Sequence, residues 1–421
     1  MSKAPLLRPE RIGCYVERLG VSDCCLVRAR KNMESTGDAG RPAGLLIAGA
    51  SVRAAVMSAQ ATNCELFAAD LFVDQELAIC RQTERLGDHY EGLREFAQSV
   101  QPDFWMYTGA LENHPRLVSA VCEHSRLLGT PAEILNRIRN PSDLSSVLTR
   151  SGFAFPEIAE ETRPIQTTGP SQAEERWIIK SRQSAAGLGI SRADSNAALK
   201  PQQYFQRLIQ GVPVSAAFLV DEATVTFLGS SLQRMAGPSF SPTEFLYGGS
   251  IGPLPLSTHE QQRWERLGCC LTDEYDLRGL IGVDAVVADN ELYVLEVNPR
   301  YTASMEVLER ASDMAFVPAH ITACRDDLGQ GVGPHFDRAK QGRLCGKAVI
   351  YAPCDIHMSQ AFSDELSDMN RNELRFVDIP QIGNQILAQH PLLTVLADGS
   401  SVEDVQRQLD DRSRQIRERF Q

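Results

Sequence analysis

The chain has 421 residues, of which 43% are hydrophobic and 23% are charged, and its formal net charge is −12. This composition is typical of a globular protein with an ordinary core and about three domains of roughly 150 residues each. The acidic balance argues against sequence-independent binding of nucleic acid, which needs a basic surface to neutralise phosphates, but it leaves room for a local basic pocket.

The cysteines and the apolar segments indicate the compartment. Eleven cysteines without a regular framework argue against a secreted disulfide scaffold. No apolar run approaches the roughly 20 residues that a transmembrane helix needs, and the N-terminus lacks the apolar core of a signal peptide. We therefore expect a cytoplasmic protein that does not insert into a membrane and does not bind nucleic acid.

The first domain is expected to begin after an N-terminal extension, residues 1–41, whose role the sequence leaves open. Residues 45–69 predict a strand, an Ala-rich helix and a second strand, in that order. A single glycine, Gly49, stands at the first turn, so the full G-x-G-x-x-G pattern of dinucleotide sites is absent. We expect a Rossmann-like domain over residues 42–135.

Three polar residues of this domain are candidates for substrate binding. Arg53, in the first turn of the Ala-rich helix, is placed either to meet an anionic substrate or to be a solvated helix arginine. Glu112 and Asn113 follow a predicted strand at 104–108. Ligands of open α/β sheets bind beyond the carboxyl ends of strands, which favours a substrate role for both, with a plain loop as the alternative.

The second domain is expected over residues 136–330. Residues 177–180 predict a strand that ends in Lys180, and a loop of small residues, 184–190, comes directly after it. Small residues allow backbone N–H groups to approach phosphate oxygens, and the lysine adds a point charge beside them. The loop lacks the G-K-[ST] of a Walker A motif, and a simple glycine hairpin remains the alternative.

The next segment predicts antiparallel β structure. Residues 213–220 and 225–228 form two strands around a turn, and Gln233 and Arg234 come next as substrate-binding candidates or ordinary strand residues. The glycine-rich residues 248–253 predict a flexible loop, and residues 261–276 predict a helix.

The most informative stretch is residues 279–300, where two β-rich runs flank Asp289-Asn290 and predict a hairpin. Folding the hairpin at residue 290 places Val286 opposite Val294 and Asp284 opposite Glu296. Directly opposed residues have Cβ atoms about 4.5–5.5 Å apart on one face of the sheet. Asn298 lies two residues beyond Glu296 and therefore points to that face as well.

Two carboxylates and one amide oxygen thus converge, and hard oxygen ligands suit Mg²⁺, or Mn²⁺ in its place. Arg300 comes after Pro299 and carries a permanent charge suited to phosphate or carboxylate. Two alternatives stay open: an edge hairpin with solvated acids, and a structural ion pair between Arg300 and a carboxylate such as Glu306.

The C-terminal residues 331–421 predict a small α+β segment. Residues 346–351 and 392–397 predict strands, and residues 401–420 predict a long charged amphipathic helix.

The order of these parts resembles the ATP-grasp ligases over roughly residues 45–420. Lys180 resembles the lysine that touches the nucleotide phosphates, and Asp284, Glu296 and Asn298 resemble the magnesium ligands. The glycine loop resembles the family's lid, with Ser184, Gly187 and Gly189 near the phosphates. The segment 206–209 resembles the family's hinge, whose backbone binds adenine; its residues are Gln206, Arg207, Leu208 and Ile209. The stretch from Glu296 to Arg300 is similar to the E-x-N-x-R version in biotin carboxylase and carbamoyl phosphate synthetase relatives.

The chain also departs from the family. Gln206 stands where many members have glutamate, and Pro213 stands where D-alanine ligases have a ribose-binding glutamate. Residues 49–54, 108–113 and 346–348 resemble a narrower subgroup linked to the synthesis of methanofuran and tetrahydromethanopterin.

The resemblance implies an α/β protein with the ATP-grasp fold: a Rossmann-like pre-ATP-grasp domain, a nucleotide- and Mg-binding domain that is α+β with a lid at about 176–212, and a C-terminal α+β segment. It implies an ATP-dependent carboxylate–amine ligase that forms an acyl phosphate from a small-molecule acid, such as an amino acid or a one-carbon cofactor precursor, and releases ADP. Arg300 and Lys180 would be catalytic, and ligases of this type are often homodimers.

Two alternatives to this function remain. The first is an ATP-grasp carboxylase or carbamoyl-phosphate-type enzyme, although no carrier domain is recognisable. The second is a non-catalytic ATP-binding protein, which would have no need to keep both carboxylates.

Overall fold

The computed structural model describes residues 41–160, 177–183, 185–194, 197–222, 224–237, 244–325 and 343–420. The chain divides into two units, residues 1–41 and 42–421, and every described helix and strand belongs to the second unit. The predicted N-terminal extension, apart from Arg41, and Ser184 of the predicted lid lie outside the described residues.

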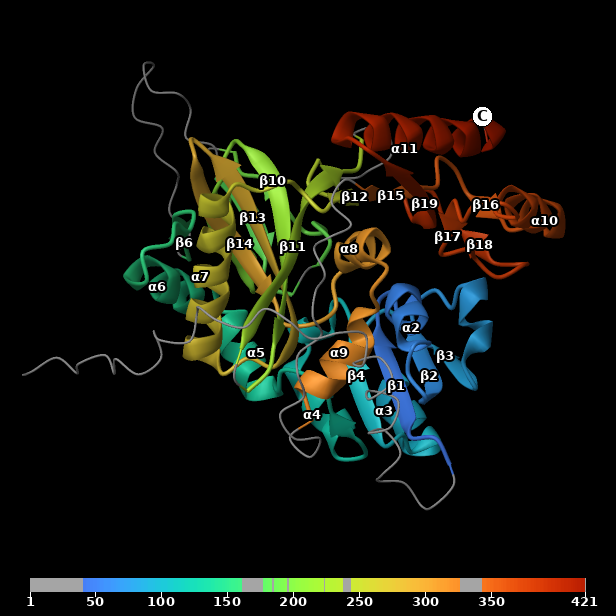
Figure 1. The fold of residues 1–421 in the computed structure, drawn as a ribbon, viewed down its shortest axis with the longest axis horizontal. Helices are drawn as coiled ribbons and strands as arrows, with labels where there is room; N and C mark the ends of the chain where they lie inside the picture. The colour runs from blue at the N-terminus through green and yellow to red at the C-terminus, as the bar shows by residue number, and fades with distance from the viewer. Residues whose placement is uncertain are drawn as a thin grey trace, which may run out of the picture. The chain divides into compact units, whose positions relative to one another are not determined.

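The first layer is a five-stranded parallel sheet in the order β3-β2-β1-β4-β5. Strands β1 to β4 are labelled in Figure 1. Its strands are β1 (Gly44–Gly49), β2 (Glu65–Asp70), β3 (Gln82–Arg85), β4 (Phe104–Tyr107) and β5 (Arg126–Leu127). Every residue of β1 is buried, as expected for a parallel strand covered on both faces. The predicted Rossmann-like opening is confirmed.

Helices cover the two faces of this sheet because successive β1 side chains alternate. Leu45 and Ile47 pack with α2 (Arg53–Ala59) and α9 (Phe316–Ala323). Leu46 and Ala48 pack on the opposite face with α3 (Leu93–Val100) and α4 (Pro115–Cys122). The short 3₁₀ turns are η2 (Gln75–Ile79) and η3 (Leu111–Asn113).

Two helices lead from this layer into the next, α5 (Ala132–Ile138) and α6 (Pro141–Arg150). The side chain of Asn140 accepts hydrogen bonds from the backbone N–H groups of Ser142 and Asp143, and Pro141 occupies the first helical position. An asparagine cap followed by proline is a sequence pattern typical of a helix start, and here it begins α6. The predicted domain boundary between residues 135 and 136 falls within α5 and stays a prediction.

A small antiparallel sheet comes next, in the order β6-β9-β7-β8. Its strands are β6 (Ile158–Ala159), β7 (Trp177–Ser181), β8 (Ser191–Arg192) and β9 (Gln203–Arg207). In the register of β7 and β9, Lys180 pairs with Tyr204 and Ile178 pairs with Gln206. Because successive side chains of a strand point to opposite faces, residues two positions apart share a face. The side chains of these four residues therefore lie on one face of the sheet.

The largest sheet has eight antiparallel strands in the order β14-β13-β10-β11-β12-β15-β19-β17. They are β10 (Val212–Val220), β11 (Val225–Met235), β12 (Tyr247–Gly252), β13 (Gly279–Ala288), β14 (Glu291–Asn298), β15 (Leu344–Tyr351), β17 (Phe376–Val377) and β19 (Pro391–Gly399). Helix α7 (Thr258–Tyr275), which starts at a capping box between Ser257 and Glu260, packs with α6 on the apolar face of β10, β13 and β14. The alternating polar residues therefore point to the other face.

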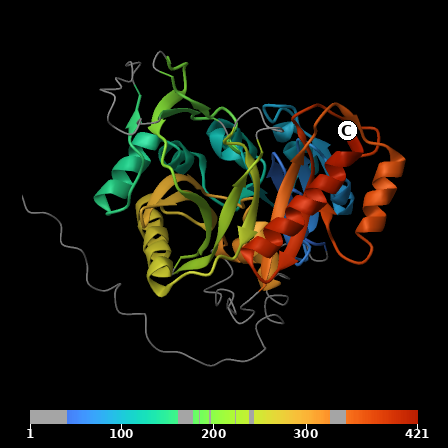
Figure 2. The same cartoon turned by 90° about the horizontal axis from the view of Figure 1, so that it is seen from above.

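The C-terminal strands continue this same sheet. Helix α11 (Val402–Arg417) packs across β15 and β19 (Figure 2) and is followed by the 3₁₀ turn η5 (Glu418–Phe420). The remaining elements are α8 (Met305–Ser312), β16 (Ile356–His357), α10 (Gln360–Met369) and β18 (Gln385–Ile386). Among the helices that the structure describes, none combines the length and the apolar character that a membrane crossing requires.

The prediction of a flexible loop at residues 248–253 is wrong, because these residues form most of β12, between β11 and β15. The glycines serve close backbone approach. A Cβ on Gly249, which has φ of +138°, would lie 2.0 Å from the carbonyl oxygen of Lys347.

The predicted hairpin is confirmed, but its predicted register is only partly correct. Asp289 and Asn290 have φ of +49° and +63°, as in a two-residue type I′ turn, so Val286 pairs with Tyr293 and not with Val294. A bulge at Leu295 then shifts the register by one residue, and Asp284 does pair with Glu296. Without that bulge, Glu296 would oppose Val283 and point to the apolar face.

A buried histidine joins the two layers. His320 of α9 accepts a hydrogen bond at Nδ1 from the backbone N–H of Leu280 (2.9 Å), and its Nε2 donates to the carbonyl of Leu128 (3.1 Å). Both ring nitrogens are thus occupied in the neutral form. Burial lowers the pKa of His320 from 6.5 to about 4.

This histidine predicts a loss of stability in acid. Its folded-state pKa lies below its unfolded-state value, so its stabilising effect is complete above about pH 6.5 and declines as the pH falls toward about 4, by up to about 3 kcal/mol. We expect His320→Gln to flatten the decline in the free energy of unfolding, measured by urea denaturation, across this window. The matched control is the exposed His357→Gln. Equal slopes in both variants would contradict the prediction.

Candidate functional site

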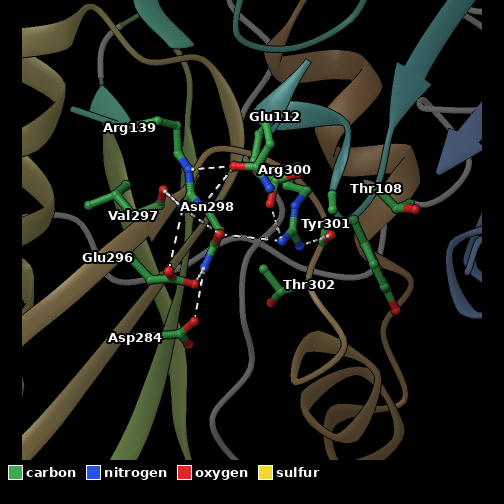
Figure 3. Close-up of polar contacts among 12 residues, drawn as sticks. Thr108, Glu112, Arg139, Asp284, Glu296, Val297, Asn298, Arg300, Tyr301 and Thr302 are labelled. Atoms are coloured by element: carbon green, nitrogen blue, oxygen red, sulfur yellow. Dashed lines mark hydrogen bonds and ion pairs between the residues drawn. The ribbon is translucent and has the colours of Figure 1, made fainter. Parts of the chain in front are cut away.

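The site is built around the two opposed carboxylates of β13 and β14. The side-chain Nδ2 of Asn298 donates to Asp284 Oδ2 (2.9 Å) and to Glu296 Oε1 (3.2 Å), as Figure 3 shows. Asp284 Oδ1 also accepts from Ser215 Oγ and Gln233 Nε2, each at 2.7 Å. The three predicted metal ligands therefore lie together on one face of the sheet.

The two carboxyl groups differ in pKa. Burial raises the pKa of Asp284 to about 7, and the charge of Glu296 adds to this effect. Burial also opposes the ionisation of Glu296, but the charges of Arg139 and Lys180 outweigh it and lower that pKa to about 2. Glu296 is hence the ionised member of the pair, and its charge discourages ionisation of Asp284.

This set of donors fits magnesium. Mg²⁺ in proteins usually takes one or two carboxylates, with water and substrate phosphate in the other positions. Within the described ranges, no group of three or more His, Cys, Asp and Glu side chains could hold a metal ion by itself. The two carboxylates and Asn298 thus match a metal site whose remaining ligands come from the substrate. A cation there would reduce the repulsion between the two carboxylates, which the amide of Asn298 now bridges.

Arg139 belongs to this site, although the sequence analysis did not single it out. Its guanidinium donates to Asn113 Oδ1 (3.0 and 3.2 Å) and to Asn298 Oδ1 (3.2 Å), and its Nη1 lies 3.7 Å from Glu296 Oε2. The residue follows α5 and directly precedes the helix cap Asn140. A basic residue directly before the Asn140-Pro141 pattern was the only sequence signal, and such residues are common.

Arg300 lies on the other side of Asn298 (Figure 3) and pairs with Glu112, a residue of the first layer with 0% exposure, at 2.5 Å. It also donates to Asn298 Oδ1 (3.3 Å). Gly109 makes room for it, because a Cβ there would lie 3.1 Å from the guanidinium. The suggested ion pair with Glu306 is therefore wrong, and the partner comes from a different layer.

Glu306 instead pairs with two other cations. Arg53 donates to Glu306 and to Asp378 (2.8 Å), and Lys347 Nζ lies 2.6 Å from Glu306 Oε2. Arg53 is only 2% exposed, which excludes the alternative of a solvated helix arginine. Its charge is compensated by protein carboxylates, so its predicted role in substrate binding stays a prediction.

The two neighbouring strand residues Gln233 and Arg234 point in opposite directions. Gln233 contacts Asp284 and lines the cavity, whereas Arg234 pairs with Asp410 of α11 (2.5 Å) and is not among the cavity-lining residues. Because successive strand residues face opposite sides of a sheet, the structure brings only one of these two candidates to the site.

The predicted phosphate loop comes directly after β7. Lys180 is 6% exposed, and although burial opposes its charge, Tyr204 and Glu296 hold its pKa above the ordinary value. Gly187 has φ of +81°, and a Cβ there would lie 1.8 Å from the carbonyl oxygen of Phe245. Gly187 lines the cavity but Gly189 does not. The loop is tied down by a hydrogen bond from Tyr247 N to Ala186 O (2.9 Å).

One cavity of about 480 Å³ is bordered by the three predicted metal ligands, by the four predicted hinge residues 206–209, and by Arg139, Lys180, Gln233 and Arg300. Among the described residues, its lining includes the carboxylates Asp284 and Glu296, and its basic side chains are Arg53, Arg139, Lys180, Arg182, Arg207, Arg300 and Lys347. A basic cavity in a chain of net charge −12 is suited to a polyanionic ligand.

Comparisons with known proteins agree with this geometry. Residues 140–304 match the family model of the ATP-grasp domain. No curated protein matches the sequence.

Solved structures share the fold at low sequence identity. Rhizobium etli pyruvate carboxylase is 14% identical with a TM-score of 0.65 over 88% of this chain, and this chain spans only 37% of it. N5-carboxyaminoimidazole ribonucleotide synthetase, solved as an ADP complex, is 15% identical with a TM-score of 0.64, over 90% of this chain and 98% of that one. The L-amino acid ligase from Bacillus licheniformis is 15% identical with a TM-score of 0.62, over 88% and 98%.

The chain therefore contains an ATP-grasp domain and has the ATP-grasp fold. These findings confirm the predicted α/β fold class and the predicted ATP-grasp fold. The assignment of individual residues to ATP, metal and substrate stays a prediction, as does the narrower subgroup.

The buried pair of Arg300 and Glu112 predicts a large effect on stability. Glu112→Gln preserves shape but removes the carboxylate that pairs directly with Arg300, which should lower the free energy of unfolding by about 3–5 kcal/mol. The control is Glu123→Gln, which removes an exposed pair with Arg94 and should cost less than about 1 kcal/mol. Urea denaturation measures both, and similar costs would contradict the prediction.

Proposed function

We propose that this chain is an ATP-dependent carboxylate–amine ligase. It activates a small-molecule acid as an acyl phosphate, joins that acid to an amine, and releases ADP and phosphate. The observation that carries the proposal is the basic cavity of an acidic chain, with two opposed carboxylates in its wall. The matched domain and the likeness to an L-amino acid ligase support it.

The nucleotide would lie between the small sheet and the hairpin. Ile178 and the hinge residues Leu208 and Ile209 offer apolar contacts to a base, and Lys180 offers a charge to the phosphates. Ser184 and Gly187 would contribute from the lid loop. Gly189 would contribute less, because it does not border the cavity.

Asp284, Glu296 and Asn298 would hold Mg²⁺, or Mn²⁺ in its place. The bound ion would supply charge neutralisation for the phosphates. Glu296 would attract the cation more strongly than Asp284, because it is the ionised member of the pair before the metal binds.

The remaining residues position the reacting groups. In the first step an oxygen of the acid attacks the γ-phosphorus and the bond to ADP breaks; in the second, the amine attacks the acyl carbon and phosphate leaves. Arg300 has a buried Nε without a hydrogen-bond partner among the described residues, so it can donate to the attacking carboxylate or to the acyl phosphate. Arg139 would stabilise charge from the opposite side of Asn298.

The polar residues of the first layer would lie at the acid end of the site. Glu112 and Asn113 would then act by holding Arg300 and Arg139, and Gln233 by holding Asp284. We also propose that the chain divides into the predicted domains and acts as a homodimer. Its location would be the cytoplasm, and its activity would serve one-carbon cofactor synthesis.

The second candidate is a carboxylase that uses bicarbonate as its acid. The similar fold of pyruvate carboxylase favours it. Bicarbonate dependence of ADP release separates it from the ligase.

The decisive experiment combines the protein with Mg-ATP, pooled amino acids and hydroxylamine. Hydroxylamine intercepts an acyl phosphate, so mass spectrometry of the hydroxamate identifies the activated acid. We expect a hydroxamate that disappears in Glu296→Ala. ADP release without any hydroxamate would favour the carboxylase, and ATP binding without ADP release would favour a non-catalytic protein.

Two cations should each be required for turnover. Lys180→Ala and Arg300→Ala each remove a charge aimed at developing phosphate charge, so turnover should fall by about a hundredfold or more. The controls are the exposed residues in Lys200→Ala and Arg94→Ala, with circular dichroism to confirm folding. Unchanged ADP release in both site variants would contradict the assigned roles.

The two adjacent residues of β11 should behave differently. Gln233→Leu removes a hydrogen bond to Asp284, and turnover should fall by about tenfold to a hundredfold. Arg234→Leu removes a pair with Asp410 and should reduce the free energy of unfolding by at most about 1 kcal/mol, with turnover retained. A larger loss of turnover in Arg234→Leu would show that this residue contacts substrate.

A further inference from the structure

One polar side chain in the apolar part of the cavity has an unused donor. Gln206 of β9 is 1% exposed and lines the cavity. Its Nε2 has no hydrogen-bond partner among the described residues. Leaving a buried amide nitrogen unpaired is costly, so this group is suited to receive a ligand acceptor.

The surroundings of Gln206 indicate what kind of ligand group meets it. Its partner across the strands is Ile178, and Leu208 and Ile209, which continue its own chain, also line the cavity. Lys180 lies on the same face, about 7 Å further along β7. The base of a nucleotide, a flat apolar ring with a polar edge, would suit the place beside Gln206. The phosphates of that nucleotide would then point toward Lys180.

One neighbouring backbone donor is already engaged. The N–H of Arg207 donates to Glu157 O (2.8 Å), so it is engaged within the protein. The carboxamide of Gln206 carries both an acceptor oxygen and a donor nitrogen, and rotation about its last bond presents either one. A glutamate in this place would offer acceptors only.

This difference matters for purine bases. Adenine carries an amino group at position 6, which donates, whereas guanine carries an oxygen there, which accepts. Hypoxanthine, the base of ITP, has the same 6-oxo group without the 2-amino group of guanine. A carboxylate would repel the 6-oxo group, and a carboxamide can bond to both kinds of base.

We propose that Gln206 reads position 6 of the purine and admits both 6-amino and 6-oxo nucleoside triphosphates, so that ITP and GTP replace ATP as phosphoryl donors. The proposal rests on the proposed function for the placement of the base. It makes Gln206 the residue that sets nucleotide selectivity.

The test measures the dissociation constants of Mg-ATP, Mg-ITP and Mg-GTP by calorimetry on the full chain, together with nucleoside diphosphate release. In the wild type we expect ITP to bind within about tenfold of ATP, because the amide pairs with either base. Gln206→Glu should leave ATP binding largely intact and weaken ITP and GTP by about tenfold or more. Gln206→Leu, which lacks both donor and acceptor, should weaken all three by a similar factor.

The matched control is Gln203→Glu, which adds the same charge to the same strand at a residue that does not line the cavity. It should leave the ratio of ITP to ATP affinity unchanged, and thermal unfolding of each variant establishes that the fold is intact. Exclusion of ITP by the wild type by more than about a hundredfold would overturn the proposal, as would an unchanged ratio in Gln206→Glu. Absence of binding of any nucleotide would overturn the proposed function and, with it, this inference.

Discussion

The repulsion between Asp284 and Glu296 is the constraint on which the rest of the site depends. Two carboxylates on directly opposed strand positions, both only partly exposed, cannot ionise freely unless positive charge surrounds them. The protein answers with the bridging amide of Asn298 and with cations nearby. Those cations lower the pKa of Glu296, whereas burial and the charge of Glu296 raise the pKa of Asp284 to about 7. The pair can therefore accept a further positive charge.

The compensating groups come from parts of the chain that are far apart. Arg139 follows α5, Lys180 lies near the end of a strand of the small sheet, and Arg300 follows the hairpin and takes its countercharge from Glu112 of the first layer. Breaking the arrangement at any one of them leaves buried charge without its partner. The same electrostatic balance therefore stabilises the packing of the layers and forms the basic cavity that suits a nucleotide.

Several elements were predictable because the relevant interaction is local. The Asn140-Pro141 start of α6 and the alternation of β13 and β14 follow from neighbouring residues alone. Other predictions failed where the interaction is distant. The glycines of β12 indicated a loop, but β11 and β15 need them for close approach. The prediction that Asp284 lies opposite Glu296 is correct only because the bulge at Leu295 compensates for the one-residue register difference that the two-residue turn introduces.

The sequence by itself determined the order of the elements, the family resemblance and the position of the hairpin, because periodicity and short motifs depend on residues a few positions apart. Only the tertiary structure decided which charges meet. It paired Arg300 with Glu112 and Arg53 with Glu306, placed Arg139 beside Glu296, and turned Arg234 away from the cavity toward Asp410. Such pairs join positions up to some hundreds of residues apart, and Coulomb attraction between them depends on the packing of layers, which no local pattern encodes.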